Sequence, residues 1–466
     1  MALMQRRSQN SYFRRLTLLK KLFWLYFLLL IFEGALRKWV APQLSAPLLI
    51  IRDPIGIWII WEAYRTRKWP VRWSTAIAFL TVLLMGLFAA QLIAGDNLFA
   101  ELYGLRTYLL PFPVLFIMGE NLDEEDLRRM GVLTLWILLP MSLLEVAQFK
   151  AAPTSFLNKG AYQGAAQISF AGAHLRASGT FSFSIGSEEF AVLAAAFIFY
   201  GMIREGYAKK WLLWASAFAL LVSVPMMGSR TMVYQLAIML GCMGLGAMMG
   251  ISQFTKTLRV ILPLAAVTFL VLQLPAFSNA AHDLNQRIMY TEQTGTVASQ
   301  SEGRTALNNG IYRIITPMMD TIEDPDFWRD SLGIGMGQGA VAVNALLHGT
   351  LAASAGEGEF SREFREMGPI AGILFALFKL LLGIVIFGQA LAKAREGEPL
   401  ALLLVPLSVV FLFIAQLEQP TEQGFVVIGA AICIAAAKAP ARAAIRTPLV
   451  VQRPRPPQYN RWAQRG

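Results

Sequence analysis

Residues 367–390 read MGPIAGILFALFKLLLGIVIFGQA, a run in which Lys379 is the single charged residue. About 20 mostly apolar residues are enough for a helix to cross the hydrocarbon core of a bilayer. The core offers no water to the backbone, so a spanning segment satisfies its own N–H and C=O groups by forming a helix. This run therefore predicts a membrane-spanning α-helix.

Similar runs recur along the 466-residue chain, which is 56% hydrophobic and 15% charged. Soluble domains carry roughly 25% charged residues, so composition excludes a soluble enzyme. We predict an all-α polytopic membrane protein with about twelve transmembrane helices. The predicted spans are residues 17–36, 47–63, 74–94, 105–119, 130–149, 187–203, 211–228, 231–250, 259–275, 367–390, 400–417 and 423–438.

The Lys and Arg residues predict the orientation of these spans. With a cytoplasmic N-terminus and alternating spans, 26 of the 41 basic residues fall on the cytoplasmic side, as the positive-inside rule requires. The net charge of +11 then reflects topology and predicts no nucleic-acid partner. The basic start resembles a signal peptide, but no small-residue cleavage site follows its apolar run, so we interpret it as an uncleaved first helix. Both termini are predicted to be cytoplasmic.

This orientation divides the chain into four parts. They are an N-terminal bundle of about nine helices at 1–275, with an outer loop at 150–186; a large, partly helical outer loop at 276–366; three helices at 367–438; and a disordered basic tail at 439–466.

The loop at 276–366 holds six arginines and no lysine, although basic residues are scarce outside the cytoplasm. Guanidinium groups bind phosphates through bidentate hydrogen bonds. The loop therefore predicts that the protein acts on a phosphate-linked substrate that reaches it through the membrane. Alternatively, arginines of this kind are solvated or extend to lipid headgroups. The candidate binding residues on the outer side are Arg106, Arg176, Arg230, Arg304 and Arg313.

A histidine or carboxylate near the end of this loop could act as a general base. The candidates are His348, Glu359 and Glu363, with solvation or pairing to arginines as the alternative. The glycines between 332 and 339 permit close approach of a ligand to the backbone, as would a plain loop. Neither the two cysteines nor the three histidines show metal-ligand spacing, so no metal or cofactor is expected.

Four motifs follow one another in a fixed order. They are Ser229-Arg230, Gly303-Arg304, Gly333-x-Gly335-x-Gly337 and Glu366-x-Gly368 through Gly372. In this order, and with a large outer loop before the tenth span, the chain resembles the O-antigen ligase and polymerase superfamily (Wzy and WaaL types) of bacterial envelope polysaccharide assembly. The resemblance covers most of residues 180–390.

The resemblance implies a GT-C-like fold and an inverting, metal-independent glycosyltransferase at the periplasmic face of the bacterial inner membrane. The donor would be a glycan on undecaprenyl diphosphate. Of the two types we favour a polymerase, which joins undecaprenyl-diphosphate-linked oligosaccharides into a capsule, exopolysaccharide or O-antigen. Arg230 and Arg304 would hold the diphosphate, and the loop histidine would act on the acceptor hydroxyl. His348 lies 18 residues before Glu366, farther than in the ligases, so Glu359 or Glu363 is the alternative base. Membrane lipid, a flippase and a chain-length regulator would be partners.

Three other functions fit parts of the sequence. A ligase would move a finished glycan from the same carrier to a lipid or protein acceptor, and the motifs do not separate it from a polymerase. A secondary transporter typically has two related halves and broken helices, neither of which is evident in the sequence. A non-catalytic membrane scaffold is the remaining alternative.

Overall fold

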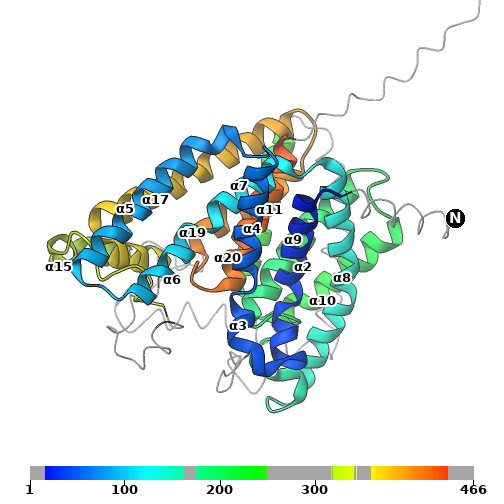
Figure 1. The fold of residues 1–466 in the computed structure, drawn as a ribbon. Helices are drawn as coiled ribbons and strands as arrows, with labels where there is room; N and C mark the ends of the chain where they lie inside the picture. The colour runs from blue at the N-terminus through cyan, green and yellow to red at the C-terminus, as the bar shows by residue number, and fades with distance from the viewer. Residues whose placement is uncertain are drawn as a thin grey trace, which may run out of the picture.

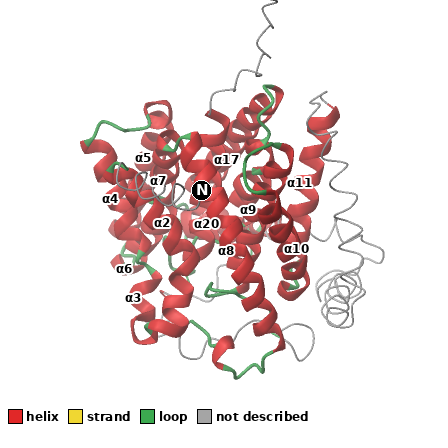
Figure 2. Cartoon of the chain, turned by 90° about the vertical axis from the view of Figure 1, so that its right-hand side faces the viewer, coloured by secondary structure: helices red, strands yellow, loops and turns green. Residues whose placement is uncertain are grey.

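The computed structural model describes residues 16–161, 175–248, 318–340 and 358–438, together with Thr316 and Val343. Throughout these parts the regular elements are helices (Figure 2), which confirms the all-α class. Eight described helical segments are long and apolar enough to cross a membrane. They are Pro42–Arg65, Val71–Ala94, Leu98–Asn121, Glu124–Lys150, Ser184–Ile203, Lys210–Met227, Glu359–Arg395 and Pro420–Lys438.

The order of elements can be followed in Figure 1. They are α2 (Leu18–Ala35), the π-helical turn η1 (Leu36–Val40), η2 (Pro42–Leu44), α3 (Ser45–Leu49), α4 (Arg52–Arg65), η3 (Val71–Trp73), α5 (Ser74–Ala94), α6 (Leu98–Tyr108), α7 (Pro111–Asn121), α8 (Glu124–Lys150), η4 (Phe156–Asn158), α9 (Ser184–Ile203), α10 (Lys210–Met227), α11 (Arg230–Met248), α15 (Pro325–Arg329), α17 (Glu359–Arg395), α18 (Leu400–Leu403), η5 (Pro406–Val410), α19 (Phe411–Ile414) and α20 (Pro420–Lys438).

Most predicted spans coincide with helices, and the span predicted at 74–94 has the bounds of α5. The span predicted at 259–275 and the tail at 439–466 lie outside the described residues. The total of twelve spans therefore stays a prediction.

Two predicted spans contain irregular helical turns, which hydropathy alone does not predict. The span predicted at 105–119 consists of α6 and α7, separated by a turn before Pro111. The span predicted at 400–417 consists of α18, η5 and α19, and Pro406 starts η5. Proline lacks a backbone N–H, which interrupts the helical hydrogen bonds at these places. Leu110 and Val405, which precede the two prolines, keep helical backbone angles.

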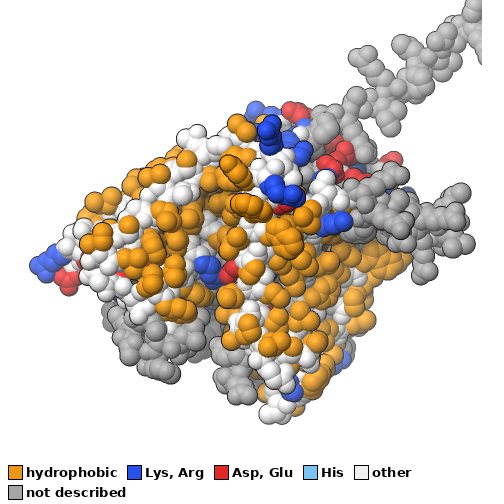
Figure 3. Space-filling model, viewed as in Figure 1, with side chains coloured by type: hydrophobic (Ala, Val, Ile, Leu, Met, Phe, Trp, Pro, Cys, Tyr) orange, Lys and Arg blue, Asp and Glu red, His pale blue; other side chains and the backbone are white. Residues whose placement is uncertain are grey.

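Ion pairs gather at one end of the bundle, which we call the charged end. Lys20 of α2 pairs with Asp126 of α8 at 2.5 Å, and Lys438 of α20 pairs with Glu120 of α7 at 3.1 Å. Figure 3 shows basic and acidic side chains at the top of a mostly hydrophobic face. Large exposed apolar side chains on α4, α5, α8, α10 and α17 suit contact with lipid, whereas α9 and α20 are buried along most of their length.

The helix α17 folds back on itself at Gly368, whose φ of 73° and ψ of 175° are not helical. Glu363 Oε1 lies 2.5 Å from Lys379 Nζ, although 16 residues of straight helix would rise about 24 Å. A Cβ added at Gly372 would lie 3.0 Å from the Cα of Phe364. Residues 359–367 and 369–395 are therefore two arms of a hairpin, and the predicted boundary at 366/367 falls next to its turn.

We expect Gly368→Ala to lower the free energy of unfolding by about 1–3 kcal/mol, since this backbone region is accessible essentially to glycine alone. The added Cβ would also lie 2.5 Å from the backbone oxygen of Ser331. Gly388→Ala in the second arm is the matched control, because its Cβ would meet no atom within 4 Å. Denaturant titrations in detergent micelles measure both variants, and equal stabilities would contradict the proposed hairpin turn.

Candidate functional site

Three chain segments meet on the carboxylate of Glu188, which lies in α9 and is 1% exposed. Arg176 forms an ion pair with one of its oxygens, and the Ser229 hydroxyl donates to the other. Arg176 Nε also donates to the Met227 carbonyl at 3.0 Å, and Ser229 Oγ caps α11 by accepting from the Met232 amide at 3.2 Å. Glu188 thus joins the segment before α9 to the turn between α10 and α11.

Arg230 directly follows Ser229 and is the first residue of α11. Its backbone therefore lies beside the pair formed by Arg176 and Glu188. The structure thus brings together two predicted binding positions, Arg176 and Arg230, that are 54 residues apart in sequence.

Further carboxylates surround this point. Glu189 accepts a hydrogen bond from Gln235 Nε2 of α11 at 2.9 Å, and Glu422 at the start of α20 accepts one from the Gln416 amide at 2.6 Å. Glu188, Glu189 and Glu422 are close enough to interact electrostatically. Burying several groups of like charge costs folding free energy, and such groups are typical of functional sites.

The first arm of α17 adds Glu359 and Arg362. Glu359 accepts a hydrogen bond from the Leu417 amide at 3.1 Å and pairs with Arg362, whose Nη1 lies 3.0 Å from Glu418 Oε1. Glu422 interacts electrostatically with both Glu359 and Glu188. These contacts make one site, which we call the polar cluster: Arg176, Glu188, Ser229, Glu359, Arg362 and Glu422.

The two predicted carboxylates of this arm have different surroundings. Glu359 belongs to the polar cluster, whereas Glu363 is fully buried and paired with Lys379. Lys379 Nζ also lies 4.4 Å from the ring centre of Phe360 and 5.6 Å from that of Phe375. Glu363 therefore joins the two arms of α17.

Arg106 lies beside the polar cluster, on α6. Its Nε donates to Asp53 Oδ2 at 2.5 Å, and its guanidinium carbon lies 5.1 Å from the ring centre of Tyr103. The Tyr103 hydroxyl donates to the Glu418 carbonyl at 3.3 Å. Arg106 Nη1 is buried and has no hydrogen-bond partner among the described residues. Tyr103 thus connects Arg106 to the same segment that Arg362 contacts.

A second group of buried basic residues lies around the end of α2. Glu33 accepts hydrogen bonds from Arg52 at 3.1 Å and Arg37 at 3.4 Å. Lys38 donates to Ser178 Oγ at 2.9 Å. Burial lowers the pKa of Lys38 to about 7, so its amine is partly uncharged at neutral pH.

The glycine-rich loop at 332–339 meets a side chain of the protein. The amides of Gly337 and Gly339 donate to the Glu366 carboxylate at 2.8 and 3.1 Å. Gly333, Gly335 and Gly337 have positive φ angles, which glycine adopts readily. The glycine backbone, which could have approached a ligand, thus binds a carboxylate of α17.

Glu101 of α6 is fully buried near this loop. Neither of its carboxylate oxygens has a hydrogen-bond partner among the described residues. The Met336 amide approaches Glu101 but is aligned with Gln91 Oε1, at 3.2 Å. Nearby, burial raises the pKa of Asp96, and the charge of Asp330 raises it further, while a hydrogen bond from Gln338 opposes both.

We expect Glu101→Gln to leave the free energy of unfolding unchanged or to raise it by about 1–3 kcal/mol, because an unpartnered buried carboxylate is costly and the amide is neutral. Denaturant titration of the purified protein measures this change. A clear loss of stability would show that the Glu101 carboxylate has a stabilising partner.

Three predicted site residues, Arg304, Arg313 and His348, lie outside the described residues. Glu188, Glu422 and Tyr108 were not among the residues predicted from the sequence. The signal for the two glutamates was present, because each lies near the start of a mostly apolar helix, where ionisable residues are rare and usually functional. In the described parts of the chain, no group of three or more His, Cys, Asp or Glu side chains is placed to hold a metal ion.

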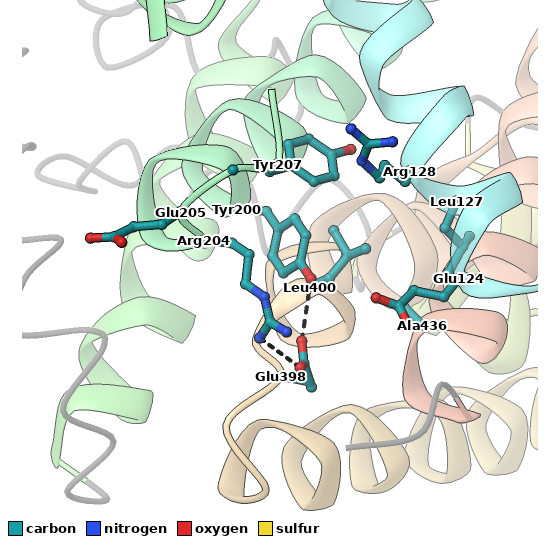
Figure 4. A pocket seen from close by; sticks show the side chains of 11 residues that line it. Glu124, Leu127, Arg128, Tyr200, Arg204, Glu205, Tyr207, Glu398, Leu400 and Ala436 are labelled. Atoms are coloured by element: carbon teal, nitrogen blue, oxygen red, sulfur yellow. Dashed lines mark hydrogen bonds and ion pairs between the residues drawn. The ribbon is translucent and has the colours of Figure 1, made fainter. Parts of the chain in front are cut away.

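A pocket of about 80 Å³ lies at the charged end, and no residue of the polar cluster lines it (Figure 4). Arg204 donates to Glu398 at 2.7 Å, and the Tyr200 hydroxyl donates to the same carboxylate at 3.2 Å. The Tyr207 hydroxyl points toward Arg128. Two arginines and three glutamates line the pocket, so it has no surplus positive charge for a phosphate group.

No protein-family model matches the chain, and no curated protein matches it.

Proposed function

We propose that this protein is a glycan polymerase that joins undecaprenyl-diphosphate-linked oligosaccharide repeat units at the periplasmic face of the bacterial inner membrane. The observation that carries the proposal is the meeting of Arg176 and Ser229 on Glu188, at the start of the helix that Arg230 opens. A buried group of this kind in an apolar bundle suits a charged substrate that arrives from the bilayer.

In this proposal the protein is an inverting, metal-independent glycosyltransferase. The acceptor hydroxyl oxygen forms a bond to the anomeric carbon of the donor sugar, the bond from that carbon to the diphosphate oxygen breaks, and undecaprenyl diphosphate leaves. Glu359 or His348 takes the hydroxyl proton. Arg230, with Arg304 of the outer loop, stabilises the negative charge that develops on the leaving group. Arg106, Arg176 and Arg313 contribute to holding the substrate.

The test uses purified protein with a lipid-diphosphate-linked oligosaccharide as the sole substrate and no added metal or nucleotide. Products are resolved by size on a gel. A ladder of lengthening lipid-linked glycan supports a polymerase. Transfer only after a lipid A core or another acceptor is added supports the ligase alternative and overturns polymerisation. No transfer under either condition overturns glycosyl transfer.

Secondary transport is a second candidate, favoured by the non-helical break at Gly368 in the hairpin of α17. Transporters often form their binding sites from discontinuous helices near the middle of the membrane. Uptake of a labelled sugar or lipid-linked glycan into proteoliposomes, without formation of a new bond, would support transport. Ladder formation without uptake would exclude it.

A further inference from the structure

One buried side chain of α5 connects the glycine-rich loop to the turn of the α17 hairpin. Gln91 Nε2 donates to the backbone oxygens of Leu332 at 2.6 Å and Glu366 at 2.8 Å. Gln91 Oε1 accepts from the Met336 amide at 3.2 Å. Gln91 is fully buried, so loop 332–339 and the end of the first arm have a common anchor.

The loop also caps the end of the first arm directly. The Ile334 amide donates to the Arg365 carbonyl at 2.8 Å. The last carbonyls of a helix have no partner within that helix. The loop thus satisfies a carbonyl that the turn at Gly368 leaves free.

The Glu366 side chain completes the connection and is 1% exposed. Its carboxylate accepts from the amides of Gly337 and Gly339 and from the Tyr108 hydroxyl, at 2.8, 3.1 and 2.8 Å. Successive backbone amides in a glycine-containing turn form a concave site for an anion. Here the anion is a carboxylate of the chain itself, and it joins α6, loop 332–339 and α17.

Glu366 shares a helix with residues of the polar cluster. Glu359, Arg362 and Glu366 are spaced i, i+3 and i+7, which places them along one face of the first arm. At the other end of this arm, Glu359 and Arg362 contact Leu417 and Glu418. A shift of the arm at Glu366 would therefore move two charged groups of the polar cluster.

We propose that Glu366 is a positioning residue. Its carboxylate clamps loop 332–339 to the first arm of α17 and thereby holds Glu359 and Arg362 in place in the polar cluster. The kinetic consequence rests on the proposed glycosyl transfer, whereas the clamp can be measured without any substrate.

The clamp is tested by hydrogen–deuterium exchange on the full-length protein in detergent micelles. Glu366→Gln keeps the size of the side chain but removes its charge and one acceptor oxygen. We expect exchange of peptides covering 332–340 to rise at least tenfold. Tyr108→Phe removes one of three hydrogen bonds and should give a smaller increase. Glu205→Gln, an exposed carboxylate at the charged end, is the matched control and should change nothing.

The positioning role is tested by glycan-ladder kinetics of the same variants. We expect Glu366→Gln to lower kcat at least tenfold and to change KM less than twofold, because the substrate-binding arginines are retained. Unchanged loop exchange in Glu366→Gln would overturn the clamp. Faster exchange with a wild-type kcat would overturn the positioning role. A wild-type protein without transferase activity would overturn the proposed function, and the exchange data would still decide on the clamp.

Discussion

Arg230→Ala is expected to lower the rate of glycan-ladder formation at least about a hundredfold. A fixed cation beside the negative charge that develops on the leaving group stabilises the transition state by several kcal/mol. The rate of the Arg230→Lys variant should lie between those of the wild type and the alanine variant, since lysine keeps the charge but cannot form the bidentate hydrogen bonds of arginine. Arg304→Ala is expected to behave like Arg230→Ala. Initial rates at saturating lipid-linked substrate measure these effects.

The matched control for this prediction is Arg329→Ala in α15. The Arg329 side chain is 79% exposed and pairs with Asp326 at the surface, so its loss should leave the rate within about twofold. All variants must be present at wild-type amounts in the membrane. Normal polymer from Arg230→Ala and Arg304→Ala would exclude the diphosphate-binding role assigned to them.

Lys379→Met is expected to lower the free energy of unfolding by about 3–5 kcal/mol, because it leaves the Glu363 carboxylate buried without its partner. Both side chains of this pair are 0% exposed, and the pair joins the two arms of α17. Denaturant titration in mixed micelles, followed by tryptophan fluorescence, measures the change.

The double variant Glu363→Leu/Lys379→Met should recover most of this loss, since a buried ion pair can often be replaced by apolar side chains of similar volume. Asp326→Asn, which breaks the exposed pair with Arg329, should have no measurable effect. If Lys379→Met were as stable as the wild type, the pair would not hold the hairpin together.

The predicted spans were accurate where a single apolar run forms a single straight helix. The helix α5 is such a case, and α9 and α10 begin and end close to the predicted residues. Hydropathy summed over about 20 residues reports whether a segment can lie in lipid. It does not report irregular turns within the segment, so the turn between α6 and α7 was not predicted.

The candidate site was predicted in part. Arg176, Arg230 and Glu359 stood out in the sequence, and the structure places them in or beside the polar cluster. From the sequence, Glu363 and Glu359 were equal candidates for the general base, because two nearby carboxylates cannot be distinguished until their partners are known. The partner of Glu363 is Lys379, which the fold-back at Gly368 brings near.

The sequence by itself determined the all-helical class and the approximate position of most described helices, because both depend on composition within short segments. The tertiary structure alone decided that the glycine-rich loop holds Glu366. Tyr108 and Glu366 are 258 residues apart, and Gln91 and Leu332 are 241 residues apart. Whether such groups meet depends on the packing of α5, α6 and α17, since a hydrogen bond requires its atoms within about 3 Å and no local pattern of residues specifies that distance.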